Sequence, residues 1–228
     1  MKKGKISNNV IRRLPRYLRK LDELTENGVT RISSFDLGQH LGFTPSQIRQ
    51  DFSCFGEFGQ QGYGYNVAEL RSSIAGILGM DRNLTAVLVG CGNIGRAMLD
   101  NFCFSNWGVE LKAAFDVNPR LIGSDFNGTT IFSMDNLPDY IRDNNIDIAV
   151  LTVPKDVARG VAENLIESGI EAIWNFTNIE ITEPNSPVIV ENIHFSDSLL
   201  SLSYYISQRQ DENEARAARL AKAANTAK

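Results

Sequence analysis

Apolar residues recur at helical spacing along the first part of the chain. Val10, Leu14, Leu18 and Leu21 fall on one face of a helix, and basic side chains fall on the other face. This pattern predicts an amphipathic first helix that ends at Gly28.

Capping signals then delimit two short helices. Ser33 can cap a helix that stops at Gly42, and Thr44 can cap the next helix, with Pro45 at its first position. Two short helices joined by about three residues that include a glycine predict a helix-turn-helix. Its second helix, over about residues 45–55, would be the one that meets base edges in duplex DNA.

Glycines alternate with aromatic residues over residues 56–67, which is the pattern of a small β-hairpin. A helix-turn-helix followed by such a hairpin predicts a winged helix. Asn66 can then cap a further helix that ends at Gly79 and leads into the next domain.

From residue 84 onward, short apolar runs alternate with helical patterns. This alternation predicts an α/β fold in which a Rossmann-like doubly wound domain follows the N-terminal winged-helix DNA-binding domain. The expected strands cover about residues 84–89, 109–115, 146–152, 170–176 and 188–190, with helices over 136–144 and from Pro154 onward.

The last apolar stretch, residues 195–207, predicts a helix that no later strand would cover. A partner subunit is therefore expected on it. The Ala-, Arg- and Glu-rich residues 208–228 are helix-prone but lack a wide apolar stripe, and a frayed tail is expected. The predicted domains are residues 1–80 (winged helix), 81–194 (Rossmann), 195–207 (dimerisation helix) and 208–228 (tail).

A glycine motif follows the first of these strands and opens a helix. Gly90 allows the tight turn, Gly92 lets a pyrophosphate approach the backbone, and Gly95 lets the helix pack on the strand. The next strand ends in Asp116, where a carboxylate would accept hydrogen bonds from ribose hydroxyls. NAD(H) is therefore predicted rather than NADP(H); the alternative for Asp116 is a turn former at a strand end.

Two later strand ends could flank the nicotinamide, although apolar residues there are equally typical of ordinary packing. Cys91 could act as a thiol sensor, but small residues are what such a loop tolerates, and no nearby cation would lower its pKa. The candidate cofactor-binding residues are Gly90, Cys91, Gly92, Asn93, Ile94, Gly95, Asp116, Val117, Thr152, Val153, Pro154, Asn175 and Phe176.

Charge is divided unevenly along the chain. Residues 1–21 carry eight basic side chains and no acidic one, and residues 1–82 have a net charge of +4 whereas residues 83–228 have −8. A basic segment attracts a polyanion through counterion release, although from charge alone a solvated helix face is an equal alternative. The candidate DNA-binding residues are Arg12, Arg13, Arg16, Ser46, Gln47, Arg49, Gln50, Gln60, Gln61 and Tyr63.

Composition narrows the class of protein further. A chain of 228 residues with 43% hydrophobic and 22% charged residues is typical of a globular protein. No apolar run approaches the ~20 residues of a membrane span, and an odd number of cysteines, three, suits a reducing compartment. We expect a cytoplasmic protein without a membrane partner, and without a metal site, because no cluster has metal-ligand spacing.

An enzyme is the competing class, namely an NAD-dependent dehydrogenase with an accessory N-terminal domain. Hydride transfer to a carbonyl usually needs a general acid or base beside the nicotinamide. The two histidines are His40, inside the helix-turn-helix, and His194, beyond the last strand, and there is no Tyr-x-x-x-Lys pair. No catalytic residue is therefore assigned, and a DNA-binding regulator is favoured.

Over about residues 8–207 the chain resembles the Rex family of redox-sensing transcriptional repressors. The resemblance is carried by residues 13–19, 44–49, 55–59, 62–67, 89–95, 114–117, 151–154, 175–176 and 190–192. It implies a homodimer with a swapped C-terminal helix that binds an AT-rich inverted repeat in double-stranded DNA. It also implies that NADH closes the dimer and releases the DNA, that NAD+ competes without doing so, and that Phe195 reaches the partner subunit's nicotinamide pocket.

The chain departs from the family pattern at several positions. The wing tip usually carries lysine or arginine where this chain has Gln60 and Gln61, which should weaken contacts to the DNA backbone. The family commonly has tyrosine in place of Asn101, and in place of His194 an aspartate linked to an arginine that matches Arg19. Because histidine cannot replace an anion opposite arginine, we expect a divergent paralogue with an altered redox response.

Overall fold

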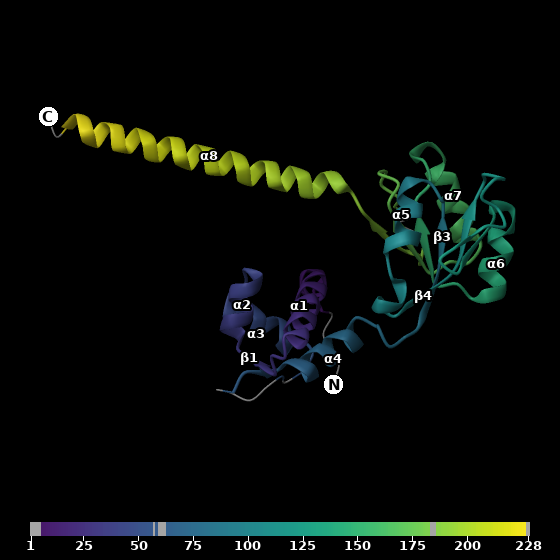
Figure 1. The fold of residues 1–228 in the computed structure, drawn as a ribbon, viewed down its shortest axis with the longest axis horizontal. Helices are drawn as coiled ribbons and strands as arrows, with labels where there is room; N and C mark the ends of the chain where they lie inside the picture. Colours follow the sequence, from purple (N-terminus) through teal and green to yellow (C-terminus); the bar gives the residue numbers. More distant parts are fainter. Residues whose placement is uncertain (1–5, 57, 59–62, 183–185, 227–228) are drawn as a thin grey trace. The chain divides into compact units, whose positions relative to one another are not determined.

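The computed structural model describes residues 6–56, 58, 63–182 and 186–226. The chain divides into two compact units. The first holds residues 1–83 and 105–109, and the second holds residues 84–104 and 110–228. Figure 1 shows residues 1–83 in purple to blue and the residues from 84 onward in teal to yellow.

The first unit is built on helices whose ends are set by capping residues. The side chains of Ser33, Thr44 and Asn66 each accept the backbone N–H three residues further on, which confirms the predicted N-caps. Gly28 and Gly42 have φ of +72° and terminate the chain's first two helices, also as predicted. The helices are α1 (Asn8–Glu26), α2 (Ser34–Leu41), α3 (Pro45–Ser53) and α4 (Val67–Ile77).

The predicted hairpin differs from the observed strand pairing. The strand β2 (Tyr65–Asn66) pairs antiparallel with β1 (Arg31–Ile32), which lies between α1 and α2 in the sequence. The strand at the end of the predicted hairpin therefore pairs with a segment that precedes the helix-turn-helix in the sequence. The glycine–aromatic pattern could not indicate this pairing. The predicted wing-tip residues Gln60 and Gln61 lie outside the described residues.

The second unit contains one sheet of seven strands in the order β5-β6-β4-β3-β7-β8-β9. Without the short edge strand β5, this is the third, second, first, fourth, fifth and sixth strand in chain order, as in a Rossmann fold. The pairs β3–β7, β4–β6, β7–β8 and β8–β9 are parallel. The strands are β3 (Leu84–Val89), β4 (Val109–Asp116), β5 (Asp125–Phe126), β6 (Thr129–Ser133), β7 (Ile148–Leu151), β8 (Ala172–Asn175) and β9 (Ile189–Asn192).

Helices α5 (Asn93–Asn101), α6 (Leu137–Asn144) and α7 (Lys155–Glu167) accompany this sheet, with the short 3-10 turn η2 (Met134–Asn136). A second 3-10 turn, η1 (Phe104–Trp107), lies mostly in the segment that belongs to the first unit. Central strand residues such as Val87, Phe115 and Leu151 are completely buried. Such near-continuous burial is expected when a parallel sheet is covered on both faces. The predicted α/β doubly wound fold is confirmed.

Helix α8 runs from Phe195 to Thr226 without interruption. Residues 208–226, predicted as a helix-prone tail, continue this helix, because they are rich in alanine, arginine and glutamate, which have high helix propensity. The fraying of this tail stays a prediction. In the part of the chain that the structure describes, no helix is both long and apolar enough to cross a membrane.

Candidate dinucleotide site and nucleic-acid interface

Two glycines of the loop between β3 and α5 are required by the local packing. Gly90 has φ of +97°, and a Cβ atom there would lie 2.9 Å from Val153 Cγ1. A Cβ atom on Gly95 would lie only 2.0 Å from the Gly90 carbonyl oxygen. The Thr152 hydroxyl also packs against this carbonyl group, because it donates a hydrogen bond to the Gly90 carbonyl oxygen at 2.6 Å. These residues therefore shape the loop.

Gly92 is different, because nothing in the protein requires a glycine there. Its φ of −72° is open to other residues, and a Cβ atom would meet no atom within 4 Å. Gly92 is also the N-cap of α5, and it provides no side-chain cap. The first turn of α5 thus offers backbone N–H groups and the positive end of a helix beside open space, which fits a pyrophosphate.

Asp116 lies at the end of β4, directly against this loop. Its Oδ2 accepts the backbone N–H of Cys91 at 2.6 Å, and its Oδ1 accepts the N–H of Asn118 at 2.7 Å. The second bond is the contact of a strand-end turn, so Asp116 has that structural role whatever it binds. The carboxylate is half-buried and retains further acceptor capacity for ribose hydroxyls.

Cys91 is buried within the loop. Burial and the nearby Asp116 carboxylate raise the pKa of its thiol to about 12. Its Sγ lies 3.8 Å from the carbonyl oxygen of Phe115. A thiol that stays protonated at neutral pH is a poor nucleophile, so the structure favours packing over a sensor role for Cys91.

The remaining candidates come after the carboxyl ends of β4, β7, β8 and β9, which lie with β3 in one continuous stretch of the sheet. Thr152 and Phe176 are nearly buried, whereas Val117 is 77% and Phe195 61% exposed. The Phe195 and Phe176 ring centroids are 6.3 Å apart. The sheet thus gathers the predicted cofactor residues at one edge, where doubly wound folds bind their ligands.

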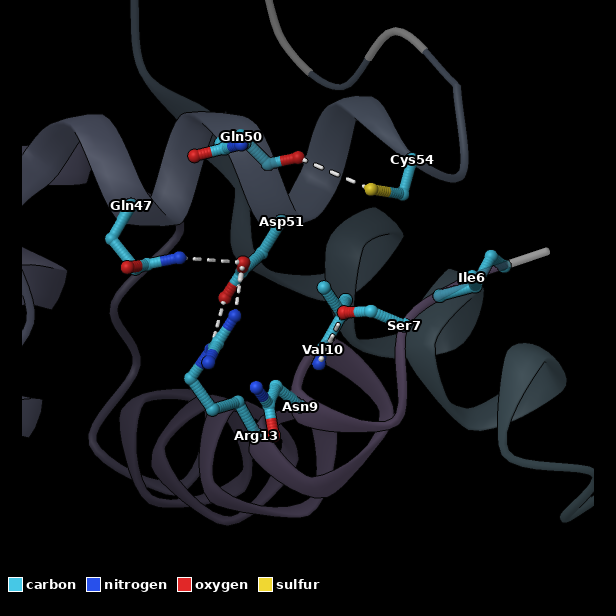
Figure 2. A pocket seen from close by; sticks show the side chains of 9 residues that line it. All are labelled: Ile6, Ser7, Asn9, Val10, Arg13, Gln47, Gln50, Asp51 and Cys54. Atoms are coloured by element: carbon cyan, nitrogen blue, oxygen red, sulfur yellow. Dashed lines mark hydrogen bonds and ion pairs between the residues drawn. The ribbon is translucent and has the colours of Figure 1, made fainter. Parts of the chain in front are cut away.

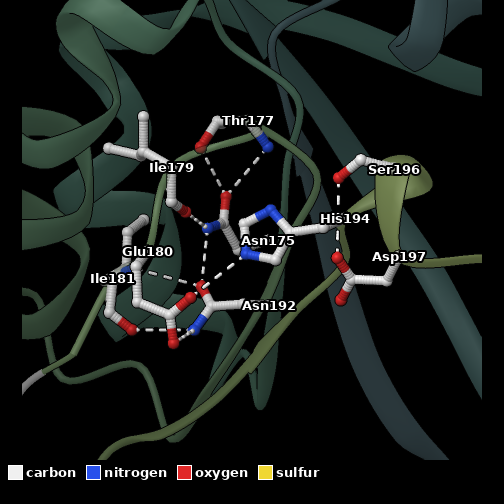
Figure 3. Close-up of polar contacts among 9 residues, drawn as sticks. All are labelled: Asn175, Thr177, Ile179, Glu180, Ile181, Asn192, His194, Ser196 and Asp197. Atoms are coloured by element: carbon white, nitrogen blue, oxygen red, sulfur yellow. Dashed lines mark hydrogen bonds and ion pairs between the residues drawn. The ribbon is translucent and has the colours of Figure 1, made fainter. Parts of the chain in front are cut away.

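Asn175 is committed to a polar network that sequence analysis does not predict (Figure 3). Its Oδ1 accepts the N–H and the hydroxyl of Thr177, and its Nδ2 donates to the Ile179 carbonyl and to Asn192 Oδ1. This use of both amide ends fixes the turn after β8. A direct contact of Asn175 with a cofactor stays a prediction.

The same network continues to the start of α8. Asn192 Nδ2 lies 3.4 Å from Glu180 Oε1, and Glu180 Oε2 lies 3.1 Å from His194 Nε2 (Figure 3). Glu180 is thus an acidic partner for His194 in this chain. No spacing in the sequence joins these residues, because they meet only when β8 and β9 pair.

In the first unit, α3 presents Ser46, Arg49 and Gln50 as exposed side chains, as expected for a base-reading helix. The Arg49 guanidinium donates to the hydroxyls of Ser34 at 3.0 Å and Ser46 at 3.2 Å. Tyr63 is 70% exposed at the base of the wing, and its carbonyl accepts from Arg31.

The predicted contact Arg13 is engaged within the protein (Figure 2). Its Nε and Nη2 donate to the two oxygens of Asp51, each at 2.7 Å, and the Tyr17 hydroxyl donates to the same carboxylate at 2.7 Å. Asp51 is completely buried. Burial alone would raise the pKa of Asp51, but hydrogen bonds from Arg13, Tyr17 and Gln47 hold it below its ordinary value. The sequence does not reveal this role of Asp51, because nothing local marks an acidic residue as buried.

Arg16 also has an internal partner. Its Nη2 donates to the Leu41 carbonyl at 2.9 Å, and its guanidinium lies 4.5 Å from the centre of the Phe43 ring. Arg12 is exposed on α1. The structure brings Arg13, Gln47 and Gln50 together around one open cavity of about 540 Å³, which is also lined by Ile6, Ser7, Asn9, Val10, Asp51 and Cys54 (Figure 2).

Comparisons with known proteins match both units. A family profile described as "CoA binding domain" matches residues 81–179, and one described as "Putative DNA-binding protein N-terminus" matches residues 5–53. The redox-sensing transcriptional repressor Rex of Clostridium botulinum is 49% identical over 209 residues, which cover 92% of this chain and 99% of that protein.

Solved structures of a Rex-family repressor also align with nearly the whole chain. RSP, a Rex-family repressor, in complex with beta-NAD+ and operator DNA aligns with a TM-score of 0.84 and 44% identity, over 94% of this chain and 98% of RSP. RSP in complex with beta-NADH aligns with a TM-score of 0.84 and 42% identity, over 92% and 98% of the two chains.

A helix-turn-helix unit and a dinucleotide-fold unit in one chain define a class, namely transcription regulators with a ligand-binding domain. Identity over nearly the whole length then decides the family. The chain belongs to the Rex family of redox-sensing transcriptional repressors. Since the curated relatives are repressors and not enzymes, the dehydrogenase alternative has no support. Among the described residues, no cluster of His, Cys, Asp or Glu could hold a metal ion.

Proposed function

We propose that this protein is a cytoplasmic homodimeric repressor that binds an AT-rich inverted-repeat operator and loses DNA affinity when NADH binds. The observation that carries the proposal is the open cradle at Gly92, with Asp116 beside it, in a chain that also holds a capped helix-turn-helix. The NAD+ and operator complex of RSP, 44% identical, supports both halves of the proposal.

The nucleotide is NAD(H) rather than another adenosine diphosphate ligand. The profile that matches the second unit is described as "CoA binding domain", and coenzyme A shares the adenosine diphosphate part of NAD. Coenzyme A and NADP(H) carry an additional phosphate on the ribose, which the Asp116 carboxylate would repel. The residues that would hold NAD(H) are residues 90–95 at the pyrophosphate, Asp116 at the ribose, and residues 152–154 with Phe176 and Phe195 near the nicotinamide.

Dimerisation is proposed through α8. Phe195, Leu199, Leu202 and Ile206 are exposed and follow one face of this helix at steps of three or four residues. A contiguous apolar stripe of this kind is typical of a surface that a partner covers. A second copy of the chain is the partner that fits a palindromic operator, because two-fold symmetry in the protein matches two half-sites.

The two ligands would oppose each other through the arrangement of the dimer. If the operator and NADH prefer different arrangements of the two subunits, each must weaken the binding of the other. The deciding experiment is fluorescence anisotropy of a labelled inverted-repeat duplex, titrated with protein and then separately with NADH, NAD+, NADPH and coenzyme A.

We expect DNA binding that NADH reverses and coenzyme A leaves unchanged. Binding that neither NADH nor NAD+ affects would contradict the sensing half of the proposal, and an absence of DNA binding would contradict the repressor half. The departures at Asn101, His194, Gln60 and Gln61 lead us to expect a weaker NADH effect than in typical relatives. A strong NADH effect with clear discrimination against NAD+ would show that the redox response is intact.

A further inference from the structure

Asp51 is a buried charge on the helix that carries the proposed base contacts. Arg13 and Tyr17 hold its carboxylate from α1, as described above, and its remaining partner comes from α3 itself. Gln47, four residues earlier on the same helix face, donates from Nε2 to Asp51 Oδ1 at 3.1 Å. The side chain of Gln47 therefore does not rotate freely at the DNA-facing surface.

The chemistry of the pair decides which end of the Gln47 amide points outward. An ionised carboxylate accepts hydrogen bonds and donates none, and the Arg13 guanidinium keeps Asp51 ionised. Only the amide nitrogen of Gln47 can then face Asp51. Its carbonyl oxygen, Oε1, is left on the side away from Asp51, as Figure 2 shows.

We propose that Asp51 is a positioning residue for operator recognition, which fixes Gln47 so that it presents an acceptor to the major groove. The base that Gln47 reads would then carry an exocyclic amino group, which is N6 of adenine or N4 of cytosine. This inference rests on the proposed role of α3 as the base-reading helix. It adds a specificity determinant that has no contact with DNA itself.

A purely structural role would not explain this arrangement. Burying an ion pair is costly, and well-packed apolar residues of similar volume often serve stability equally well. What apolar residues cannot do is select one orientation of a neighbouring amide. Arg49 and Gln50 provide the internal comparison, since they lie on the same helix and have no hydrogen bond to Asp51 among the contacts of the described residues.

The test begins with a duplex selected by the wild-type protein from a random inverted-repeat library. At each adenine or cytosine of a half-site, the base is replaced by unsubstituted purine or by pyrimidin-2-one, which lack only the amino group. At one position the wild-type protein should lose about tenfold in affinity. The Gln47→Met variant should bind the native and the replaced duplex equally at that position.

Asp51→Asn then tests the positioning step. An asparagine can turn either its oxygen or its nitrogen towards Gln47, so both orientations of the Gln47 amide become available. Discrimination at the Gln47-dependent position should fall about tenfold, while the preferences at other positions remain. Tyr17→Phe is the matched control, because it removes one hydrogen bond from Asp51 but keeps the carboxylate, so it should lower stability and leave the base preference unchanged.

The outcomes separate this inference from the function on which it rests. If the wild-type protein selects no duplex, DNA recognition fails and the inference fails with it. If a duplex is selected but Gln47→Met keeps the full amino-group dependence at every position, the inference alone is overturned. If Asp51→Asn folds and keeps full discrimination, Asp51 has no positioning role. If that variant does not fold, the Gln47→Met comparison still decides whether Gln47 reads an amino group.

Discussion

The glycines of the loop after β3 show how differently one residue type can act within six positions. Gly90 and Gly95 are fixed by contacts inside the protein, whereas a methyl group on Gly92 would point into open space. Gly90 and Gly95 therefore matter for stability, whereas Gly92 matters for ligand affinity.

We predict that Gly92→Ala folds normally but binds NADH at least tenfold more weakly, because a methyl group would occupy the space where a pyrophosphate approaches the backbone. Gly95→Ala is the comparison variant, and it should lower the free energy of unfolding by about 1–3 kcal/mol through overpacking against Gly90. Urea unfolding and NADH titration of both variants measure this contrast. Equal NADH affinity in Gly92→Ala and wild type would exclude the proposed cradle.

The buried Asp51 predicts a pH dependence of stability. Its folded pKa lies below its ordinary value, so its contribution is present above pH ~4 and is lost as the pH falls through the folded pKa. We expect Asp51→Asn to lower the free energy of unfolding by about 3 kcal/mol at pH 7, since it leaves Arg13 without an anion.

This difference between wild type and Asp51→Asn should shrink towards pH 3, which urea unfolding at several pH values would show. The exposed Asp36 of α2 offers the control, and Asp36→Asn should cost less than about 1 kcal/mol at pH 7. A difference for Asp51→Asn that stays constant with pH would argue against an ionised buried carboxylate.

At the level of elements, capping residues and apolar runs were sufficient to predict α1 to α4, the strand β3 and the glycine motif that follows it. These signals are local: a capping hydrogen bond joins residues about three positions apart, and an apolar run is read from neighbouring residues. The strands β5 and β6 were missed, although Asn127 and Gly128 between them have positive φ, and Asn-Gly is a common hairpin turn. The pairing of β2 with β1 was out of reach, because the two segments lie more than thirty residues apart.

Only part of the candidate site could be predicted from the sequence. The residues that line the loop could be listed from the glycine motif, and their assignment as ligand contacts remains a prediction. Asp51, Glu180 and Asn192 could not be found, because their partners are brought to them by tertiary structure. Helix α8 exceeded its predicted length, since propensity alone continued a helix where an apolar stripe was lacking.

The apolar stripe of α8 yields a prediction about assembly. Leu202→Glu places a charge within the exposed stripe and should convert the dimer to a monomer at micromolar concentration, because burying an unpaired charge costs several kcal/mol. Gln208→Glu adds the same charge on a different face of the helix and should remain dimeric. Sedimentation velocity distinguishes the two, and a dimeric Leu202→Glu variant would move the proposed interface elsewhere.

For the whole molecule, the proposal of opposed ligands has a quantitative consequence. The factor by which saturating NADH weakens operator binding must equal the factor by which saturating operator weakens NADH binding. Anisotropy of labelled duplex gives the first factor, and NADH fluorescence with and without duplex gives the second. Two unequal factors would mean that binding at one site involves a further equilibrium, such as dissociation of the dimer.

Each compact unit has an exposed cysteine, Cys54 after α3 and Cys103 after α5, while Cys91 is buried. A maleimide dye should therefore label two sites and spare the third under native conditions. Because Cys54 lines the cavity beside Gln47 and Gln50, bound operator should shield it from the dye and leave Cys103 reactive. The natural cysteines thus allow footprinting without any mutation: Cys54 reports on bound operator, and Cys103 in the other unit is the internal standard.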